Sequence, residues 1–149
     1  MKIAIGSDEK TSLTDFVIKE IKKKGHEVKL FGLLANKNEE YADVSRKLAE
    51  SVANKECGEG ILFCWTGTGA SITANKIPRI RAALCFDAES AKGARKWNHA
   101  NILVMSLRLT SETLAKEMLD AWFSTPCGKE DFDVRNVKKI NEIESMYNK

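Results

Sequence analysis

Cys64 and the glycine-rich turn after it are the residues best suited to do chemistry. Cys64 ends an apolar run, residues 61–64, and after Trp65 the turn consists of Thr66, Gly67, Thr68 and Gly69. Backbone amides that open a helix after such a turn attract negative charge, so they favour the thiolate form of a nearby cysteine. A thiolate is a usable base or nucleophile at cellular pH. The alternative is a cysteine that only fills space in a buried strand, and the adjacent turn favours the functional interpretation.

The same turn argues against the common nucleotide sites. It lacks the Lys-Ser/Thr ending of a P-loop, and it is not the three-glycine dinucleotide fingerprint. Its glycines allow the backbone to approach a small ligand closely, although a tight turn with left-handed residues needs them equally. A nucleotide-binding module of general Rossmann type is therefore the weakest of the functions considered.

Other candidate side chains lie near the ends of predicted strands. Asp8 follows the first apolar run, where a carboxylate can bond a sugar hydroxyl or cap the next helix. Arg108 lies just past the last predicted strand and could bind a phosphate through two parallel hydrogen bonds. His99 lies in segment 97–101, which we expect to face a ligand, although a lone histidine is more often a bystander.

Strands and helices alternate along the chain and must position these residues. Apolar runs predict strands at residues 1–6, 27–31, 61–64, 81–86 and 101–105, with a loop at 32–40. Helical spacing predicts helices at 12–24, 41–55, 70–76, 89–97, 111–123 and 133–147. This order is typical of an α/β fold: a doubly wound, Rossmann-like five-stranded parallel sheet with helices on both faces and an extra C-terminal helix. Ligands bind such sheets outside the carboxyl ends of the strands, where we expect segments 7–9, 64–69 and 97–101 to converge.

Composition limits the functions that need be considered. A chain of 149 residues with 43% hydrophobic and 30% charged residues is typical of one soluble domain, residues 1–149. A net charge of +3 provides no field to hold nucleic acid, and no window is apolar enough to span a membrane or act as a secretory signal. We expect a cytoplasmic protein. The cysteines have no Cys-x-x-Cys spacing, which argues against a zinc site or a disulfide framework; they are Cys57, Cys64, Cys85 and Cys127.

Several stretches, in order and over nearly the whole chain, resemble the B-type ribose-5-phosphate isomerase family, which includes the galactose-6-phosphate isomerase subunits. The stretches are residues 3–8 (IAIGSD), 41–43 (YAD), 60–69 (GILFCWTGTG), 74–76 (ANK), 80–83 (IRAA) and 98–101 (NHAN). Their combination is far more specific than any one of them.

The resemblance implies an enzyme that interconverts the aldose and ketose forms of a phosphorylated sugar through an enediolate. The substrate would be ribose 5-phosphate or a related pentose or hexose phosphate, with no metal or organic cofactor. Cys64 matches the base of the family, and the backbone from Thr66 to Gly69 matches an anion hole, which Asn98 also faces. Preorganised amides of this kind can contribute several kcal/mol. Asp8 matches a residue that bonds sugar hydroxyls, and Arg108 one that binds the phosphate.

The resemblance also implies a homodimer or a dimer of dimers, whose sites take residues from both subunits and give the last helix a role. Arg135 falls near the arginines that the family carries on that helix. We therefore expect the substrate to contact Asp8 and Arg108, and in addition residues of the turn, two tryptophans and several charged or polar side chains. These additional residues are Glu9, Trp65, Gly67, Thr68, Gly69, Trp97, His99 and Arg135.

Three positions depart from the family pattern. Glu9 stands where the ribose-specific members carry histidine, Trp65 replaces a glycine, and Trp97 replaces the histidine that opens the sugar ring. An indole cannot accept or deliver a proton, and His99, two positions on, points to a different side of a regular helix. A carboxylate at Glu9 would repel a phosphate.

Two functions stay open on this evidence. One is an active isomerase with altered substrate preference, in which ring opening is left to water, another side chain or an open-chain substrate; Cys64 and the intact turn favour it. The other is a sugar-phosphate-binding subunit that is not catalytic or depends on a partner, which Trp97 and Glu9 favour.

Overall fold

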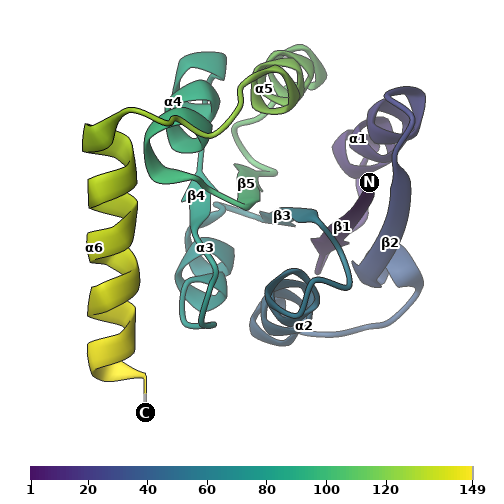
Figure 1. Ribbon diagram of the computed structural model, residues 1–149. Coiled ribbons are helices and arrows are strands. Elements are labelled where there is room, and N and C mark those ends of the chain that lie inside the picture. Colours follow the sequence, from purple (N-terminus) through teal and green to yellow (C-terminus); the bar gives the residue numbers. More distant parts are fainter. Residues whose placement is uncertain (149) are drawn as a thin grey trace.

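The computed structural model describes residues 1–148, in which five strands alternate with six α-helices (Figure 1). The strands are β1 (Lys2–Ser7), β2 (Glu27–Gly32), β3 (Glu59–Cys64), β4 (Ala82–Leu84) and β5 (Ile102–Ser106). The helices are α1 (Ser12–Lys23), α2 (Tyr41–Ala53), α3 (Thr68–Ala74), α4 (Ala88–Asn98), α5 (Glu112–Ser124) and α6 (Asp131–Tyr147), with a short 3-10 helix, η1, at Leu33–Ala35.

The five strands form one parallel sheet in the order β2-β1-β3-β5-β4. Helices α1, α4 and α5 cover one face of the sheet, and α2 and α3 cover the other, as Figure 1 shows. Helix α6 packs against α4 and lies outside these two layers, beyond the edge strand β4. The predicted doubly wound sheet with an extra C-terminal helix is confirmed.

Strand β3 lies at the centre of the sheet and is buried along its whole length. Its side chains alternate between the two faces, because successive residues of a strand point to opposite sides. Ile61 and Phe63 join the core under α1 and α5, while Leu62 and Cys64 join the core under α2 and α3. The strand therefore sets the Cys64 side chain on the α2–α3 face, at the carboxyl end of the sheet.

Helix α1 is capped at both ends. The Thr11 and Thr14 hydroxyls accept hydrogen bonds from each other's backbone N–H, at 3.3 Å for the Thr14 donor and 3.0 Å for the Thr11 donor. This reciprocal arrangement satisfies amides that a helix start leaves free. Gly25, at φ 89°, ends the helix in the left-handed conformation that suits glycine.

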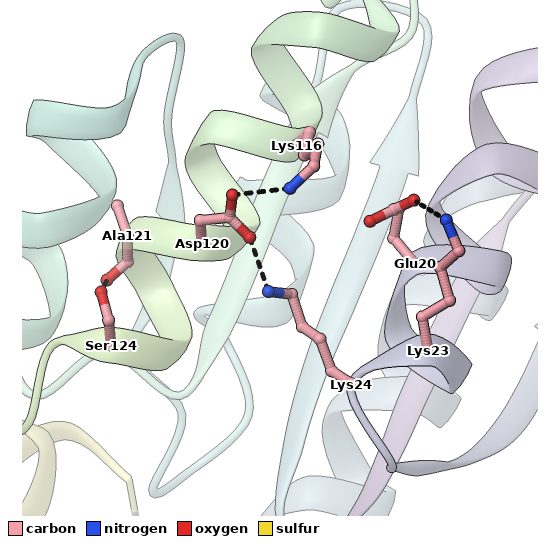
Figure 2. A network of polar contacts seen from close by, with 7 residues as sticks. All are labelled: Glu20, Lys23, Lys24, Lys116, Asp120, Ala121 and Ser124. Atoms are coloured by element: carbon pink, nitrogen blue, oxygen red, sulfur yellow. Dashed lines mark hydrogen bonds and ion pairs between the residues drawn. The ribbon is translucent and has the colours of Figure 1, made fainter.

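A polar network ties α1 to α5 near the carboxyl ends of both helices (Figure 2). Lys24 donates a hydrogen bond to Asp120 at 2.6 Å, and Lys116 donates to the same carboxylate at 2.9 Å. These two hydrogen bonds, that from Lys24 first, hold the pKa of Asp120 below its ordinary value. Because both helices run back along the sheet, the network lies at the amino ends of the strands, and Cys64 lies at the opposite edge.

Several element boundaries differ from the sequence prediction. The predicted loop at 32–40 contains η1, α3 begins two residues earlier than predicted, and α6 begins at Asp131. Strand β4 is shorter than the predicted 81–86. On its outer side, the Asn75 side chain accepts from the Ala82 N–H (2.8 Å) and donates to the Ala82 carbonyl (2.9 Å). The asparagine thus occupies the backbone groups that an edge strand would otherwise offer to another chain.

The helices of residues 1–148 include none that is both long enough and apolar enough to cross a membrane.

Candidate active site

The turn from β3 into α3 brings a backbone amide to the Cys64 sulfur. Gly67 opens α3 at φ 80° and ψ −15°, a left-handed conformation that glycine adopts without strain. In this conformation the Gly67 N–H donates a hydrogen bond to Cys64 Sγ at 3.2 Å. A donor at this position stabilises negative charge on the sulfur. The predicted proximity of the thiol to the amides of the turn is confirmed for the Gly67 amide.

The loop after β5 holds this turn in place. The Trp65 carbonyl accepts hydrogen bonds from the Ser106 hydroxyl (3.0 Å) and from the Arg108 N–H (2.9 Å). The Cys64 carbonyl accepts from the Leu107 N–H at 3.0 Å. The position of the thiol therefore depends on β5 as well as on β3, since Cys64 pairs with Ser106 at the end of the ladder.

A cavity of about 300 Å³ opens beside the sulfur, at the carboxyl ends of β1 and β3. It is lined by Asp8, Tyr41, Cys64, Trp65, Thr66, Thr68 and Gly69. Cys64 is only 6% exposed, yet it forms part of the cavity wall. Small-ligand sites in doubly wound sheets lie at this edge, and the size suits a small metabolite.

Two threonine hydroxyls form a pair on the cavity wall. Thr66 Oγ1 and Thr68 Oγ1 lie 2.6 Å apart, and the Thr68 N–H also donates to Thr66 Oγ1 at 3.4 Å. A hydroxyl that accepts from its neighbours keeps its own proton free for another acceptor. The pair can therefore donate a hydrogen bond to an oxygen of a ligand in the cavity.

Asp8 places a carboxylate in the cavity from the end of β1. Its Oδ1 is buried and has no hydrogen-bond partner within residues 1–148. Burial raises the pKa of Asp8 above its ordinary value, and a hydrogen bond from its own backbone N–H opposes this rise. An unpaired buried oxygen beside a cavity is a group that a ligand can satisfy.

Sequence reasoning missed Tyr41 as a member of the site. Tyr41 is the first residue of α2 and lines the cavity, and its ring packs so closely over Gly69 that a Cβ there would collide with it. A signal was available, because helices that follow parallel strands begin at the carboxyl edge of the sheet. Residue 41 also lies in one of the stretches that resemble the family.

The structure separates Trp97, Asn98 and His99 from this cavity. These residues end α4 just before β5 begins, so they lie at the amino ends of the strands. Asn98 lines a different groove, about 440 Å³ in volume, between α6 and β4. The His99 Nε2 donates a hydrogen bond to the Gly128 carbonyl at 2.8 Å. The expectation that segment 97–101 converges with the other two segments in one chain is wrong, because a crossover helix carries its last residues away from that edge.

The other charged candidates, Glu9, Arg108 and Arg135, lie outside the cavity wall in the same chain. Glu9 and Arg108 are exposed; the former follows Asp8, and the latter is attached to the Trp65 carbonyl through its backbone. Arg135 lies on α6, with its guanidinium 5.7 Å from the centre of the Phe132 ring. Trp65 is 55% exposed at the rim of the cavity.

The remaining cysteines are free thiols away from the cavity. Burial raises the pKa of Cys85, which follows β4, to about 11, and burial also raises the pKa of Cys57. Neither thiol is therefore suited to act as a base at neutral pH. Within residues 1–148, no group of three or more His, Cys, Asp or Glu side chains could hold a metal ion.

A parallel doubly wound sheet with a thiol in a small cavity at its carboxyl edge is typical of an α/β protein that binds a small ligand. The family model described as Ribose/Galactose Isomerase matches residues 3–143. The chain belongs to this family, as its motifs predict, and it is an isomerase of the sugar-phosphate type.

Individual relatives agree with this assignment. The chain is 42% identical over 126 residues to ribose-5-P isomerase B of Listeria innocua, which covers 84% of this chain and 85% of that protein. It is 38% identical over 128 residues to D-erythrulose-4-phosphate isomerase of Pectobacterium atrosepticum, with 82% of each chain covered. The structure of Clostridium thermocellum ribose-5-phosphate isomerase B matches with a TM-score of 0.91 at 40% identity, and covers 99% of this chain and 100% of that one.

Proposed function

We infer that this chain interconverts an aldose phosphate and a ketose phosphate in the cytoplasm, with Cys64 as the base. Ribose 5-phosphate or a related pentose or hexose phosphate is the substrate. The observation that carries this proposal is the Cys64 sulfur, which lines a cavity and accepts a hydrogen bond from the Gly67 N–H at 3.2 Å. The thiolate removes the proton from C2 of the open-chain aldose, the proton of the C2 hydroxyl passes to the oxygen at C1, and the thiol returns its proton to C1 of the enediolate. No cofactor is needed.

The turn after Cys64 stabilises the negative charge that develops on the sugar. Removal of the C2 proton leaves charge on the oxygen at C1, and donors already in place lower the barrier. The paired hydroxyls of Thr66 and Thr68, 2.6 Å apart on the cavity wall, supply one such donor. The backbone of Gly67 and Gly69 brings the chain close enough for its amides to take part.

A second copy of the chain completes the site. Asn98, Trp97 and Arg135 lie away from the cavity of their own chain, so they contact a substrate only across an interface between copies. Helix α6 supports this proposal, because it exposes large apolar side chains: Phe132, Val134, Ile140, Ile143, Met146 and Tyr147. Apolar surface on this scale is typical of a helix that packs against another subunit. We therefore propose a homodimer, or a dimer of dimers, with shared sites.

A screen of phosphorylated sugars tests the proposed reaction. We expect the purified homo-oligomer to interconvert at least one aldose–ketose pair among tetrose 4-phosphates, ribose 5-phosphate, allose 6-phosphate and galactose 6-phosphate. The measurement is product formation by a coupled assay, with exchange of the C2 proton into deuterated water as an independent readout. Saturable binding with neither turnover nor exchange would instead identify a non-catalytic binding subunit, and activity that needs a second related chain would identify a partner-dependent one.

Mixed oligomers test whether the site is shared. We expect Cys64→Ala and Asn98→Ala to be inactive alone, and a mixture refolded together to regain up to about a quarter of wild-type activity. The gain arises because half of the dimers are mixed, and each mixed dimer contains one site with both native residues. If each site lay within one chain, no mixture would contain an intact site and no activity would return. Analytical ultracentrifugation checks that mixed oligomers form.

A further inference from the structure

Sugar phosphates that form rings pose a problem which Cys64 does not solve. In a furanose the aldehyde carbon is bound to the ring oxygen, so the C2 proton is not acidic until the ring opens. Opening transfers one proton from the anomeric hydroxyl to the ring oxygen, and a side chain that can carry a proton speeds this transfer. The cavity must therefore supply a proton carrier in addition to the base.

Asp8 is the one carboxyl among the residues that line the cavity. The other polar side chains of the cavity wall, apart from Cys64, carry hydroxyls, and a hydroxyl group is in general a much weaker acid than a carboxyl. The Cys64 thiol is already committed to the C2 proton under the proposed function. This leaves the Asp8 carboxyl as the proton carrier.

The surroundings of Asp8 suit that role. Its Oδ1 is buried at the cavity and has no hydrogen-bond partner in residues 1–148, so its lone pairs are available to a ligand. No Lys, Arg or His in the described part of the chain forms an ion pair with it. Burial raises the pKa of Asp8, which makes its conjugate acid easier to form during a reaction.

Neither Trp97 nor Asn98, which a second copy would bring, replaces Asp8. Indole and carboxamide groups, as in Trp97 and Asn98, do not exchange protons in this pH range. The His99 Nε2 is bound to the Gly128 carbonyl of its own chain at 2.8 Å.

We propose that Asp8 opens the sugar ring, a catalytic role that rests on the proposed isomerase function. The carboxylate takes the proton of the C1 hydroxyl; the C1–O1 double bond forms as the bond between C1 and the ring oxygen breaks. The carboxyl then returns the same proton to the former ring oxygen. The step consumes nothing, and it leaves the open-chain aldehyde beside Cys64.

A pair of substrates that differ in their ability to form a ring tests the proposal. Ribose 5-phosphate closes a furanose through O4, whereas in a tetrose 4-phosphate that oxygen carries the phosphate and cannot close one. We expect Asp8→Asn to lower kcat on ribose 5-phosphate by about 10²-fold and to change kcat on erythrose 4-phosphate by less than about threefold. Rates are measured under conditions in which turnover is faster than spontaneous ring opening in the buffer, because faster spontaneous opening would hide the loss of the catalysed step.

Two further variants serve as controls. Asp8→Glu keeps a carboxyl and should restore part of the ribose 5-phosphate activity. Asp15→Asn removes an exposed carboxylate in the first turn of α1 and should leave both rates unchanged. Thermal unfolding of each variant checks that the fold is intact.

The outcomes separate this role from the proposed function. Equal losses on both substrates in Asp8→Asn would make Asp8 a binding residue and overturn the proposal, as would no loss on either. Wild-type turnover of the tetrose phosphate alone would also overturn it, while the isomerase function would stand. Wild-type turnover of neither sugar, nor of any other in the screen, would remove both.

Discussion

Alanine in place of Cys64 is expected to lower the turnover of the sugar phosphate by about 10³-fold or more, with little change in its binding. The cavity wall contains one thiol, and the Gly67 N–H lies 3.2 Å from its sulfur, so the variant removes the group that we propose takes the C2 proton. Binding depends mainly on other groups. Steady-state kinetics on the best substrate of the screen gives kcat, and isothermal titration calorimetry gives the dissociation constant.

Cys85→Ala is the matched control, because Cys85 is also buried near the carboxyl edge of the sheet but does not line the cavity. We expect this variant to lose some stability and to keep its turnover per folded molecule. Cys64→Ser should remain nearly as inactive as the alanine variant, since a hydroxyl is a much weaker acid than a thiol. A Cys64→Ala enzyme with more than about a tenth of the wild-type rate would assign the base to another group.

The sequence predicts the turn after Cys64 well because its components are neighbours in the chain. The apolar run 61–64 indicates a strand covered on both faces, and β3 is indeed buried throughout. The glycines that follow indicate a tight turn, which places the Gly67 amide against Cys64. Local sequence therefore predicts this contact, and the loop after β5 then holds the turn in place.

The parts of the site that depend on other molecules are harder to predict. Asn98 lies between the predicted helix 89–97 and the predicted strand 101–105, and a residue shortly before a parallel strand lies at the amino edge of the sheet. The path of α4 back along the sheet sets Asn98 at that edge. Cys64 lies at the other end of β5, where it pairs with Ser106. No local sequence pattern predicts the second copy that would bring Asn98 to a cavity. The exposed apolar side chains of α6 are the feature of the described residues that points to such a partner.

The length of β4 shows a second limit. Residues 81–86 have the composition of a strand, but only Ala82–Leu84 pair with β5. The edge position explains the difference, because β4 has a neighbour on one side alone and Asn75 occupies part of the other. Pairing, rather than propensity, sets where an edge strand ends.

Gly67→Ala is expected to reduce both stability and turnover. Gly67 has φ 80°, and a Cβ built there would lie 2.5 Å from Leu84 Cδ1. The backbone strain costs about 1–2 kcal/mol, and displacement of the leucine adds up to about 1 kcal/mol more. Any shift of the turn also moves the N–H that faces Cys64, so we expect kcat per folded molecule to fall by about tenfold. Urea unfolding and steady-state kinetics measure the two effects.

Gly25→Ala separates strain from position. Gly25 has nearly the same backbone conformation, φ 89°, but a Cβ there would meet no atom within 4 Å, and the residue lies at the opposite edge of the sheet. Its substitution should therefore cost only the strain, about 1–2 kcal/mol, and leave kcat unchanged. If Gly67→Ala behaved in the same way, with full turnover per folded molecule, the turn would be a structural connection alone. A loss of kcat confined to Gly67→Ala would instead show that the position of its amide contributes to the reaction.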